Sequence, residues 1–462
     1  MGRKRQKNQL ELAFMRRGRG ETGQSIAEGT ELSGVSGGEE SPVTDEKLME
    51  EICEWRNLRR ALKQVITNKG APGVDGMKVT ELPRHLYRNR KRITESLLEG
   101  RYRPQAVLRK EIPKPNGGVR KLGIPVVLDR MIEQAMAQRI QGRWERTFSE
   151  ASYGFRPGRS QHDAVEQAQE YLREGNGWVV DLDLEKFFDR VNHDRLTARL
   201  ATRIGDKRVL KLIRAFLSAG ILENGLEQPS WEGTPQGGPL SPLLSNIVLD
   251  ELDEELERRG HRFVRYADDV SIFVCSERAG QRVLASITRF VEKKLKLRVN
   301  RDKSGVGRAH RAKILGFGFT SSRAKPKRRI HKVSLKRFKE RVRELTNRNQ
   351  RVSMARRIER LNLYLQGWVG YYGRCQTPSV VKALDSWIRR RLRAVYWAQW
   401  KTHRQRLRQL QRLGLTGYQA GWLSGRPWGP SRISGLKWLG WALPNLHFDQ
   451  LGLIRLSSRL KA

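Results

Sequence analysis

The sequence predicts an α+β protein in which a ferredoxin-like antiparallel sheet, backed by helices on one face, precedes an all-helical segment. Two observations predict this class. Strand-like and helix-like stretches follow a β, α, β, β order in the middle of the chain, and the apolar spacing beyond residue 325 is helical throughout. A third observation concerns partners. The 462 residues include 91 Lys and Arg against 49 Asp and Glu, a formal net charge of +42, which is typical of proteins that bind nucleic acid.

Composition argues against several other classes of protein. No apolar run approaches the length needed to span a membrane, and the basic start MGRKRQKNQLELAFMRRGRG lacks an apolar signal segment. The three cysteines, Cys53, Cys275 and Cys375, lie far apart without a CxxC pair, so the sequence offers neither a zinc site nor a redox couple of that kind. We therefore expect a reduced, cytoplasmic compartment and no membrane partner.

The first part of the chain combines an arm, a helix and a hairpin. Residues 1–45 pass from a basic block into a Gly/Ser/Glu-rich stretch and are expected to be a disordered arm, either a solvated tail or a grip on nucleic acid. The stretch EKLMEEICEWRNLRRALKQVI, residues 46–66, has helical spacing, and GAPGVDG after it is a loop. VLRKEIPKPNGGVRKLGIPV predicts a basic hairpin that carries Lys114 and Arg120.

The middle of the chain supplies the predicted sheet. WVVDLDLEKFF (178–188) has strand chemistry, PLSPLLSNIVLDELDEELERRG (239–260) has helical spacing, and FVRYADDVSIFV (263–274) folds back on itself around Ala267. A helix with Val283 and Ile287 on one side follows, and KILGFGF (313–319) is a further short strand. This order gives an antiparallel sheet with helices on one face, so acidic side chains would lie on the open face.

The chain ends in helices with basic outer faces. Apolar residues step by three and four through 335–345, 356–373 and 381–395, which predicts a three-helix bundle. On the last of these helices four arginines are predicted to face away from the apolar side: Arg389, Arg390, Arg391 and Arg393. Four tryptophans follow in residues 401–462 and serve either as core or as platforms for bases: Trp422, Trp428, Trp438 and Trp441.

Three acidic positions carry the chemical prediction. Asp181 and Asp183 are two residues apart, so in a strand both point to one face. Pairing of this strand with the RYADDVSIFV hairpin brings Asp183 next to Asp268 and Asp269. Without the other motifs, Asp268 and Asp269 would be typical of a turn. Divalent cations relieve the repulsion, and carboxylate oxygens completed by substrate phosphates favour Mg²⁺. Two Mg²⁺ about 3.5–4 Å apart can activate a 3′-hydroxyl and stabilise departing pyrophosphate. Asp181 is either an outer acid or a salt-bridge partner.

Five motifs together resemble the reverse transcriptase of bacterial group II introns: YGFRPGRS (153–160), DLEKFFD (183–189), TPQGGPLSPLLSN (234–246), YADD (266–269) and LRVNRDKS (297–304). IERLNLYLQGWVGYYG and the Arg-rich helix after it resemble the maturase-specific segment, domain X, and the closing residues resemble such chains that lack a C-terminal HNH endonuclease. The resemblance runs from about residue 50 to the C-terminus. It implies a right-hand polymerase, with fingers and palm in 46–325, a helical thumb and domain X in 326–400, and a basic Trp-rich tail in 401–462.

The resemblance also implies roles for single residues. It assigns two Mg²⁺ ions to Asp183, Asp268 and Asp269, with the backbone carbonyl of Leu184 as a further ligand. Five residues are implied to bind the dNTP: Lys114 and Arg120 on its triphosphate, Phe188 against the sugar 2′-position, Gln236 beside the nascent base pair and Lys303 at the departing pyrophosphate. In the same loop, Gly237 and Gly238 would let the backbone approach nucleotide or template closely. RNA contacts are predicted for the arginines at 389, 390, 391 and 393.

For several of these residues a purely structural role remains an alternative. Phe188 can be plain core packing, since Phe187 lies beside it. Lys303 can be a solvated charge. Tyr153, Phe155 and Arg156 either take part in function or only stabilise the fingers.

The implied function is an RNA-directed DNA polymerase that also binds its group II intron RNA to assist splicing and intron mobility in the bacterial cytoplasm. Its partners would be that RNA, an RNA template, a DNA primer or target, and dNTPs, with a homodimer left open. One alternative is a retron-like or domesticated reverse transcriptase in defence or repair, against which domain X argues. The other is a non-catalytic RNA-binding splicing factor, against which the intact Asp183, Asp268 and Asp269 argue.

Overall fold

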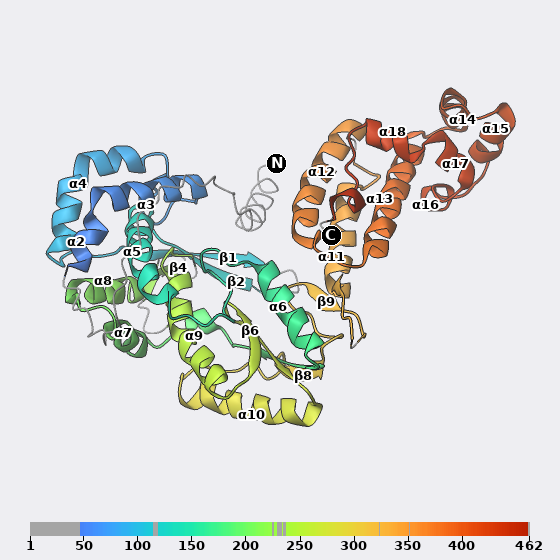
Figure 1. Ribbon diagram of the computed structural model, residues 1–462. Helices are drawn as coiled ribbons and strands as arrows, with labels where there is room; N and C mark the ends of the chain where they lie inside the picture. Colours follow the sequence, from blue (N-terminus) through green and yellow to red (C-terminus); the bar gives the residue numbers. More distant parts are fainter. Residues whose placement is uncertain are drawn as a thin grey trace, which may run out of the picture. The chain divides into compact units, whose positions relative to one another are not determined.

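A computed structural model of the protein describes residues 47–113, 119–223, 226–228, 233, 237–322, 324–350 and 352–460, with only the backbone of residues 120 and 226–228 (Figure 1). The expected arm at 1–45 lies outside these residues. The described chain divides into two compact units at residues 308 and 309. The first unit holds two four-stranded sheets, and the second is mostly helical.

The first unit begins with the helices α2 (Leu48–Cys53), α3 (Trp55–Asn68), α4 (Leu82–Leu98) and α5 (Val127–Glu145). The prediction of one helix over 46–66 is wrong, because the backbone is extended at Glu54, with φ −53° and ψ 131°. The amide of buried Asn57 donates to the carbonyls of Ile52 and of Ala135 in α5, both at 3.0 Å. The Asn57 side chain therefore satisfies a carbonyl at the end of α2 and links it to α5, which sequence periodicity does not reveal.

The first sheet contains the predicted hairpin. Strands β1 (Val107–Pro113) and β2 (Val119–Ile124) pair antiparallel, and the sheet order is β2-β1-β4-β5, with β4 at Ile221–Glu223 and β5 at Leu226–Gln228. Helices α7 (His193–Ala201) and α8 (Lys207–Leu217) precede β4. Glu223 accepts from Arg109 at 3.1 Å and from Lys121 at 3.2 Å. The long connection from β3 to α9 therefore returns to the hairpin and pairs with it.

The second sheet is the predicted ferredoxin-like core. Its order is β6-β7-β3-β8, all antiparallel, with β3 at Trp178–Asp183, β6 at Arg262–Tyr266, β7 at Asp269–Val274 and β8 at Gly305–Arg308. Helix α9 (Ser241–Arg258) enters β6, and α10 (Glu277–Lys293) connects β7 toward β8 (Figure 1). The apolar sides of both helices belong to the same core as Val180 and Leu182 of β3. The βαββαβ order of this prediction is confirmed.

Two details of the predicted sheet are wrong. The fourth strand is β8, not the stretch 313–319, of which only β9 (Phe317–Phe319) is a strand and pairs with β10 (Arg328–Ile330) in the second unit. Strand β8 has the sequence GVGR, whose glycines give no alternating apolar signal. Helix α6 (Gln161–Arg173) also packs on the other face, where the rings of Tyr171 and Phe273 lie 5.4 Å apart. One end of the supposedly open face is therefore covered.

The second unit contains the predicted three-helix bundle of α11 (Lys332–Leu345), α12 (Met354–Tyr372) and α13 (Pro378–Gln399). Five shorter helices follow: α14 (His403–Arg412), α15 (Gly417–Ser424), α16 (Pro430–Ile433), α17 (Lys437–Ala442) and α18 (Asn445–Gln450). The rings of Trp422 and Trp438 lie 4.8 Å apart, and the Arg426 guanidinium lies 4.1 Å from the Trp422 ring. Trp441 is 51% exposed. In neither unit does a described helix have the length and apolar character to cross a membrane.

Candidate active site

Strands β3 and β7 bring two of the predicted ligands together. Asp183, the last residue of β3, pairs with Asp269, the first residue of β7. Residues that face each other across antiparallel strands lie on the same face of the sheet. Asp268 lies in the two-residue turn between β6 and β7, where Ala267 has a φ of 58°. Asp183 and the adjacent pair Asp268 and Asp269, which are far apart in the sequence, thus occupy one end of the sheet.

The stretch LRVNRDKS closes around Asp183. The Asp183 backbone N–H donates to Ser304 Oγ at 2.9 Å, and its carbonyl accepts from the Asn300 N–H at 2.8 Å. Lys303 Nζ lies 3.8 Å from Asp183 Oδ1, with 66% of the lysine side chain exposed. Leu184 forms a backbone bridge with Val299. The backbone of this segment therefore fixes the end of β3 and places an ammonium group beside its carboxylate.

Asp181 and the two phenylalanines have distinct surroundings. Asp181 Oδ1 accepts from Ser271 Oγ at 3.0 Å, across the strand pair. Phe187 is 2% exposed in the core, whereas Phe188 is only partly buried, with its ring 5.2 Å from that of Phe187. Of the two neighbours, Phe188 is the ring that a substrate can reach.

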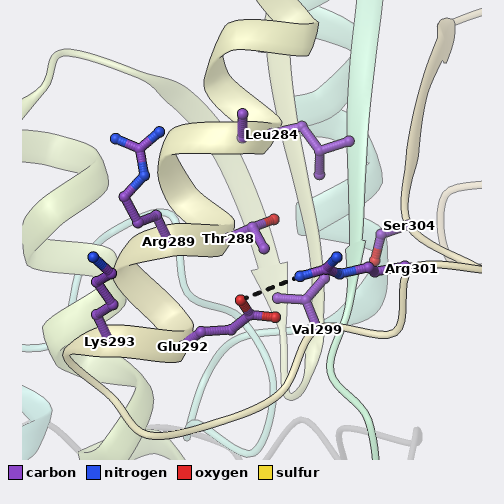
Figure 2. Close-up of a pocket in the computed structure, with 9 residues that line it drawn as sticks. Leu284, Thr288, Arg289, Glu292, Lys293, Val299, Arg301 and Ser304 are labelled. Carbon is purple, nitrogen blue, oxygen red and sulfur yellow. Dashed lines mark ion pairs between the residues drawn. The ribbon is translucent and has the colours of Figure 1, made fainter.

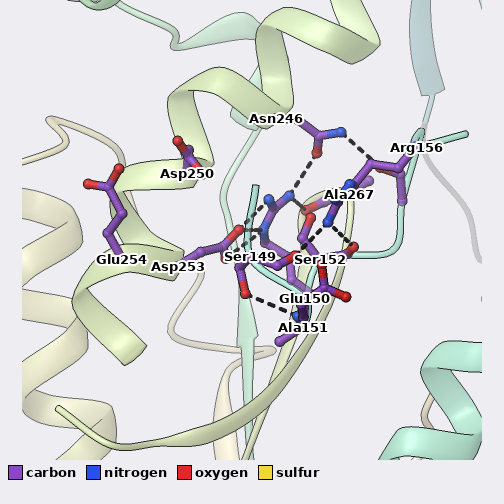
Figure 3. Close-up of polar contacts among 12 residues, drawn as sticks. Ser149, Glu150, Ala151, Ser152, Arg156, Asn246, Asp250, Asp253, Glu254 and Ala267 are labelled. Carbon is purple, nitrogen blue, oxygen red and sulfur yellow. Dashed lines mark hydrogen bonds and ion pairs between the residues drawn. The ribbon is translucent and has the colours of Figure 1, made fainter. Parts of the chain in front are cut away.

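Arg265, the first residue of RYADD, is fully buried, among the polar contacts that join Asn246 and Asp253 of α9 to Ala267 (Figure 3). Its guanidinium donates to both carboxylate oxygens of Asp253 in α9, at 2.5–2.9 Å. It also donates to Asn246 Oδ1 at 2.9 Å and to the Ala267 carbonyl at 3.1 Å. A buried charge pair needs such complete hydrogen bonding to be tolerated. The turn that carries Asp268 is thereby tied to α9.

The segment YGFRPGRS packs directly on the same turn. The Tyr153 N–H donates to the Arg265 carbonyl at 2.9 Å, and Asn246 Nδ2 donates to the Gly154 carbonyl at 2.8 Å. A Cβ at position 154 would lie 2.2 Å from the backbone nitrogen of Ala267. Only glycine fits there. Tyr153 and Arg156 are buried, which favours a stabilising role for these two residues.

Arg265, Asp253 and Asn246 were missed by sequence reasoning. In a chain of +42 net charge, an arginine is expected to be solvated or to bind nucleic acid. Asp253 and Asn246 lie among several other polar residues of α9, and the sequence alone does not show that these two are buried. The available signal was the position of Arg265 inside a strand, directly after the apolar residues Phe263 and Val264.

Only part of the predicted nucleotide-binding site lies within the described residues. Lys114 and Gln236 lie outside the described residues, and for Arg120 the structure gives only its backbone, in β2. The glycines of TPQGG do permit a close approach, but to protein atoms. A Cβ on Gly237 would lie 2.2 Å from the Gly123 carbonyl oxygen, and a Cβ on Gly238 would lie 2.2 Å from Glu133 Oε2. These two contacts position the loop against β2 and α5.

Glu133 gives this loop a titratable anchor. Its carboxylate is 5% exposed and accepts from the Leu240 N–H at 3.2 Å. Burial raises the pKa of Glu133 from 4.5 to about 8, nearby Asp129 adds to the shift, and the Leu240 N–H and Arg130 oppose it. In the unfolded chain this carboxyl ionises near its ordinary pKa of 4.5. Between pH 4.5 and about 8, unfolding therefore releases a proton from Glu133. The stability due to this group is therefore full below pH 4.5 and declines as the pH rises toward 8.

Replacing Glu133 by Gln should flatten that decline. We expect wild type to lose up to roughly 4 kcal/mol of unfolding free energy between pH 5 and 8 through this group, and Glu133→Gln to lose much less. Asp129, whose pKa burial raises to about 6, should leave a smaller slope in both proteins. Urea unfolding at several pH values measures the difference. Identical pH profiles would contradict it.

A pocket of about 420 Å³ lies elsewhere, between α10 and residues 299–304 (Figure 2). Basic side chains line it, including Arg289, Lys293 and Arg301, and Arg301 lies 3.5 Å from Glu292. Helix α10 covers the sheet face opposite to that of Asp183 and Asp269. Asp183 and Asp268 are partly exposed and Asp269 is exposed, and none of the three lines this pocket.

The predicted RNA contacts of α13 need correction. Arg389 is 3% exposed, with its guanidinium 2.7 Å from Asp449, so its expected place on a solvated face is wrong. Arg391 donates to Thr346 Oγ1 at 2.7 Å and Arg393 to the Leu443 carbonyl at 2.8 Å. Arg390 is exposed. The physical reason is that neighbouring segments cover α13: residues after it supply Asp449 and Leu443, and the end of α11 supplies Thr346 as the partner of Arg391.

The acids offer oxygen donors of the kind that Mg²⁺ prefers. Among the described residues, no group of three or more His, Cys, Asp or Glu side chains is arranged to hold a metal ion by itself. Mg²⁺ ordinarily binds through one or two carboxylates, with waters and substrate phosphates completing its shell. The facing pair of Asp183 and Asp269, with Asp268 adjacent, offers hard oxygen donors of this kind.

The comparisons with known proteins agree with this arrangement. Residues 112–319 match the family described as reverse transcriptase (RNA-dependent DNA polymerase), and residues 335–414 match the group II intron, maturase-specific domain. Protein YkfC of Escherichia coli is 36% identical over 293 residues, which cover 55% of this chain and 76% of YkfC. The group II intron-encoded protein LtrA of Lactococcus lactis is 41% identical over 165 residues, 36% of this chain and 27% of LtrA.

Among solved structures, a chain of a partial Cas6-RT-Cas1–Cas2 complex is 25% identical, with a TM-score of 0.35, over 54% of this chain and 43% of that one. The reverse transcriptase match contains Asp183, Asp268 and Asp269, and the maturase match contains most of the three-helix bundle. The chain belongs to the group II intron-encoded reverse transcriptases, RNA-directed DNA polymerases with a maturase-specific domain.

Proposed function

We propose that the protein copies an RNA template into DNA from dNTPs by two-Mg²⁺ nucleotidyl transfer at Asp183, Asp268 and Asp269. The single observation that carries this proposal is the register of β3 and β7, which sets Asp183 opposite Asp269. In the reaction the primer 3′-oxygen attacks the α-phosphorus of a dNTP, a P–O bond forms, and the bond to pyrophosphate breaks. Bound Mg²⁺ would supply charge neutralisation and lower the pKa of the 3′-hydroxyl.

The protein's own groups do the rest. Asp183 and Asp269 would bind the Mg²⁺ ions at the primer terminus. The turn around Ala267 keeps Asp268 beside them. Lys303, 3.8 Å from Asp183, can neutralise the departing pyrophosphate or give it a proton. Lys114 and Arg120 are proposed to clamp the triphosphate, because an ammonium and a guanidinium fork suit a polyphosphate. Gln236 is proposed to line the nascent base pair.

The test is dNTP incorporation by the protein freed of nucleic acid, on an RNA template with a DNA primer and Mg²⁺. Extension that needs all four components supports the proposal. A protein that binds RNA tightly but extends nothing would favour the non-catalytic splicing factor.

Phe188 should set the choice of sugar. Its ring is only partly buried beside core residue Phe187, and we propose that it blocks a ribose 2′-hydroxyl. Replacing Phe188 by Val is expected to raise the ratio of rNTP to dNTP incorporation by about 100-fold. Removing the clash between this ring and the ribose 2′-hydroxyl is worth roughly 3 kcal/mol. Parallel single-nucleotide kcat/KM values measure this ratio. Phe187→Val, the matched control, should lower stability and leave the ratio unchanged.

We also propose that the protein binds its group II intron RNA and assists splicing and mobility. The maturase-domain match at 335–414 and the net charge of +42 support this role. The chemistry would come from the RNA, so protein binding should lower the Mg²⁺ concentration at which the intron splices. An intron RNA that splices equally without the protein would count against it. The same match weighs against a retron-like role.

A further inference from the structure

We propose that Phe155 is a nucleic-acid contact of the polymerase, with its ring packed on the primer–template duplex next to the primer terminus. This inference rests on the proposed function. Phe155 is the third residue of YGFRPGRS, and it is 45% exposed. Within the described chain, no ring-stacking or cation–π contact involves it. A large aromatic side chain so placed has apolar surface left for a ligand.

The backbone at Phe155 is strained. Its φ is +61°, in the left-handed region that disfavours side chains with a Cβ and especially bulky ones. Such conformations persist only where the surroundings impose them, and they cluster at functional sites. A glycine or asparagine would adopt this backbone more readily, so stability alone does not explain the phenylalanine.

The neighbours of Phe155 impose the conformation. On one side, the Gly154 carbonyl accepts from buried Asn246, and Gly154 lies against the Ala267 nitrogen. On the other, the buried Arg156 guanidinium donates to the Ser152 carbonyl at 2.9 Å and lies 2.8 Å from Glu145. Both flanking residues are therefore fixed, and the ring between them is left at the surface.

The same contacts locate the ring relative to the chemistry. Gly154 contacts the residue directly before Asp268, so Phe155 is attached one residue from the catalytic turn. The primer 3′-end must reach Asp183, Asp268 and Asp269 for the reaction to occur. Whatever occupies the surface at Phe155 during synthesis is accordingly the end of the duplex, where an aromatic face can pack on a base or sugar.

Three variants test this contact by primer–template affinity without dNTP, by KM for primer–template, and by thermal unfolding. Phe155→Tyr keeps the ring and should bind within about twofold of wild type. Phe155→Leu and Phe155→Gly should bind about tenfold more weakly, a loss typical of one aromatic–base contact. Because glycine relieves the positive φ, Phe155→Gly should unfold at the wild-type temperature or above it. Lys69→Gly, at another non-glycine residue with positive φ (48°), controls for relief of strain alone.

A fluorescent base analogue at the primer 3′-end reports the position of the ring. We expect the analogue to be quenched by wild type and by Phe155→Tyr, and to be bright with Phe155→Gly. Wild-type affinity in Phe155→Gly would overturn the inference, as would a lower unfolding temperature that accounts for its weaker binding. Failure of wild type to extend any primer would instead overturn the proposed function, so the two failures are distinguishable.

Discussion

Replacing Asp268 by Asn is expected to lower dNTP incorporation by about 1000-fold or more and to leave RNA affinity unchanged. The amide has nearly the shape of the carboxylate but no charge, so it cannot balance a divalent cation, and roughly 4 kcal/mol of transition-state stabilisation is lost. The side chain lies in the turn between β6 and β7, so the fold should tolerate the change. Primer extension and a filter-binding titration with intron RNA measure the two properties.

Asp181→Asn is the matched control for this prediction. Asp181 lies on the same face of β3, two residues before Asp183, but hydrogen-bonds to Ser271. We expect its loss to cost about tenfold in incorporation at most. If both variants lose activity equally, Asp181 belongs with the ligands. If Asp268→Asn keeps wild-type activity, the acids have another purpose.

Replacing Arg265 by Met is expected to destabilise the first unit by about 3–5 kcal/mol. The change leaves Asp253 as an uncompensated charge at 0% exposure, and it removes donors from Asn246 and the Ala267 carbonyl. At this size of unit, the loss corresponds to a drop in melting temperature of about 10 °C or more. Thermal unfolding followed by circular dichroism measures it.

Arg259→Met serves as the control for Arg265→Met, because Arg259 pairs with Glu255 at the partly exposed end of α9. Ion pairs of that kind are worth at most about 1 kcal/mol. The double variant Arg265→Met/Asp253→Leu should regain much of the lost stability, since it removes the orphaned charge as well. It should still lose incorporation, because the turn would lack its tie to α9. Full activity in the double variant would contradict a role for Arg265 in positioning Asp268.

The prediction of the fold succeeded where the periodicity was long. The helices at 241–258 and 277–293 and the hairpin around Ala267 have strong apolar patterns, and the resulting sheet is confirmed. The prediction was wrong where pairing depends on backbone alone, as in β8, or where a buried polar side chain interrupts a helical pattern, as Asn57 does after α2. Neither effect leaves a local pattern in the sequence.

Local patterns in the sequence were enough to predict the α+β class, the family, the β, α, β, β order of the second sheet and the three aspartates. These properties follow from local periodicity, from charge and from motifs of a few adjacent residues. Which arginines are buried in ion pairs, and so cannot contact nucleic acid, is seen only in the tertiary structure. Arg265 and Arg389 are as basic as any other arginine in the sequence, but both are buried and paired. Burial depends on what folds over a residue, and the covering segment can lie sixty residues away, as Asp449 does from Arg389.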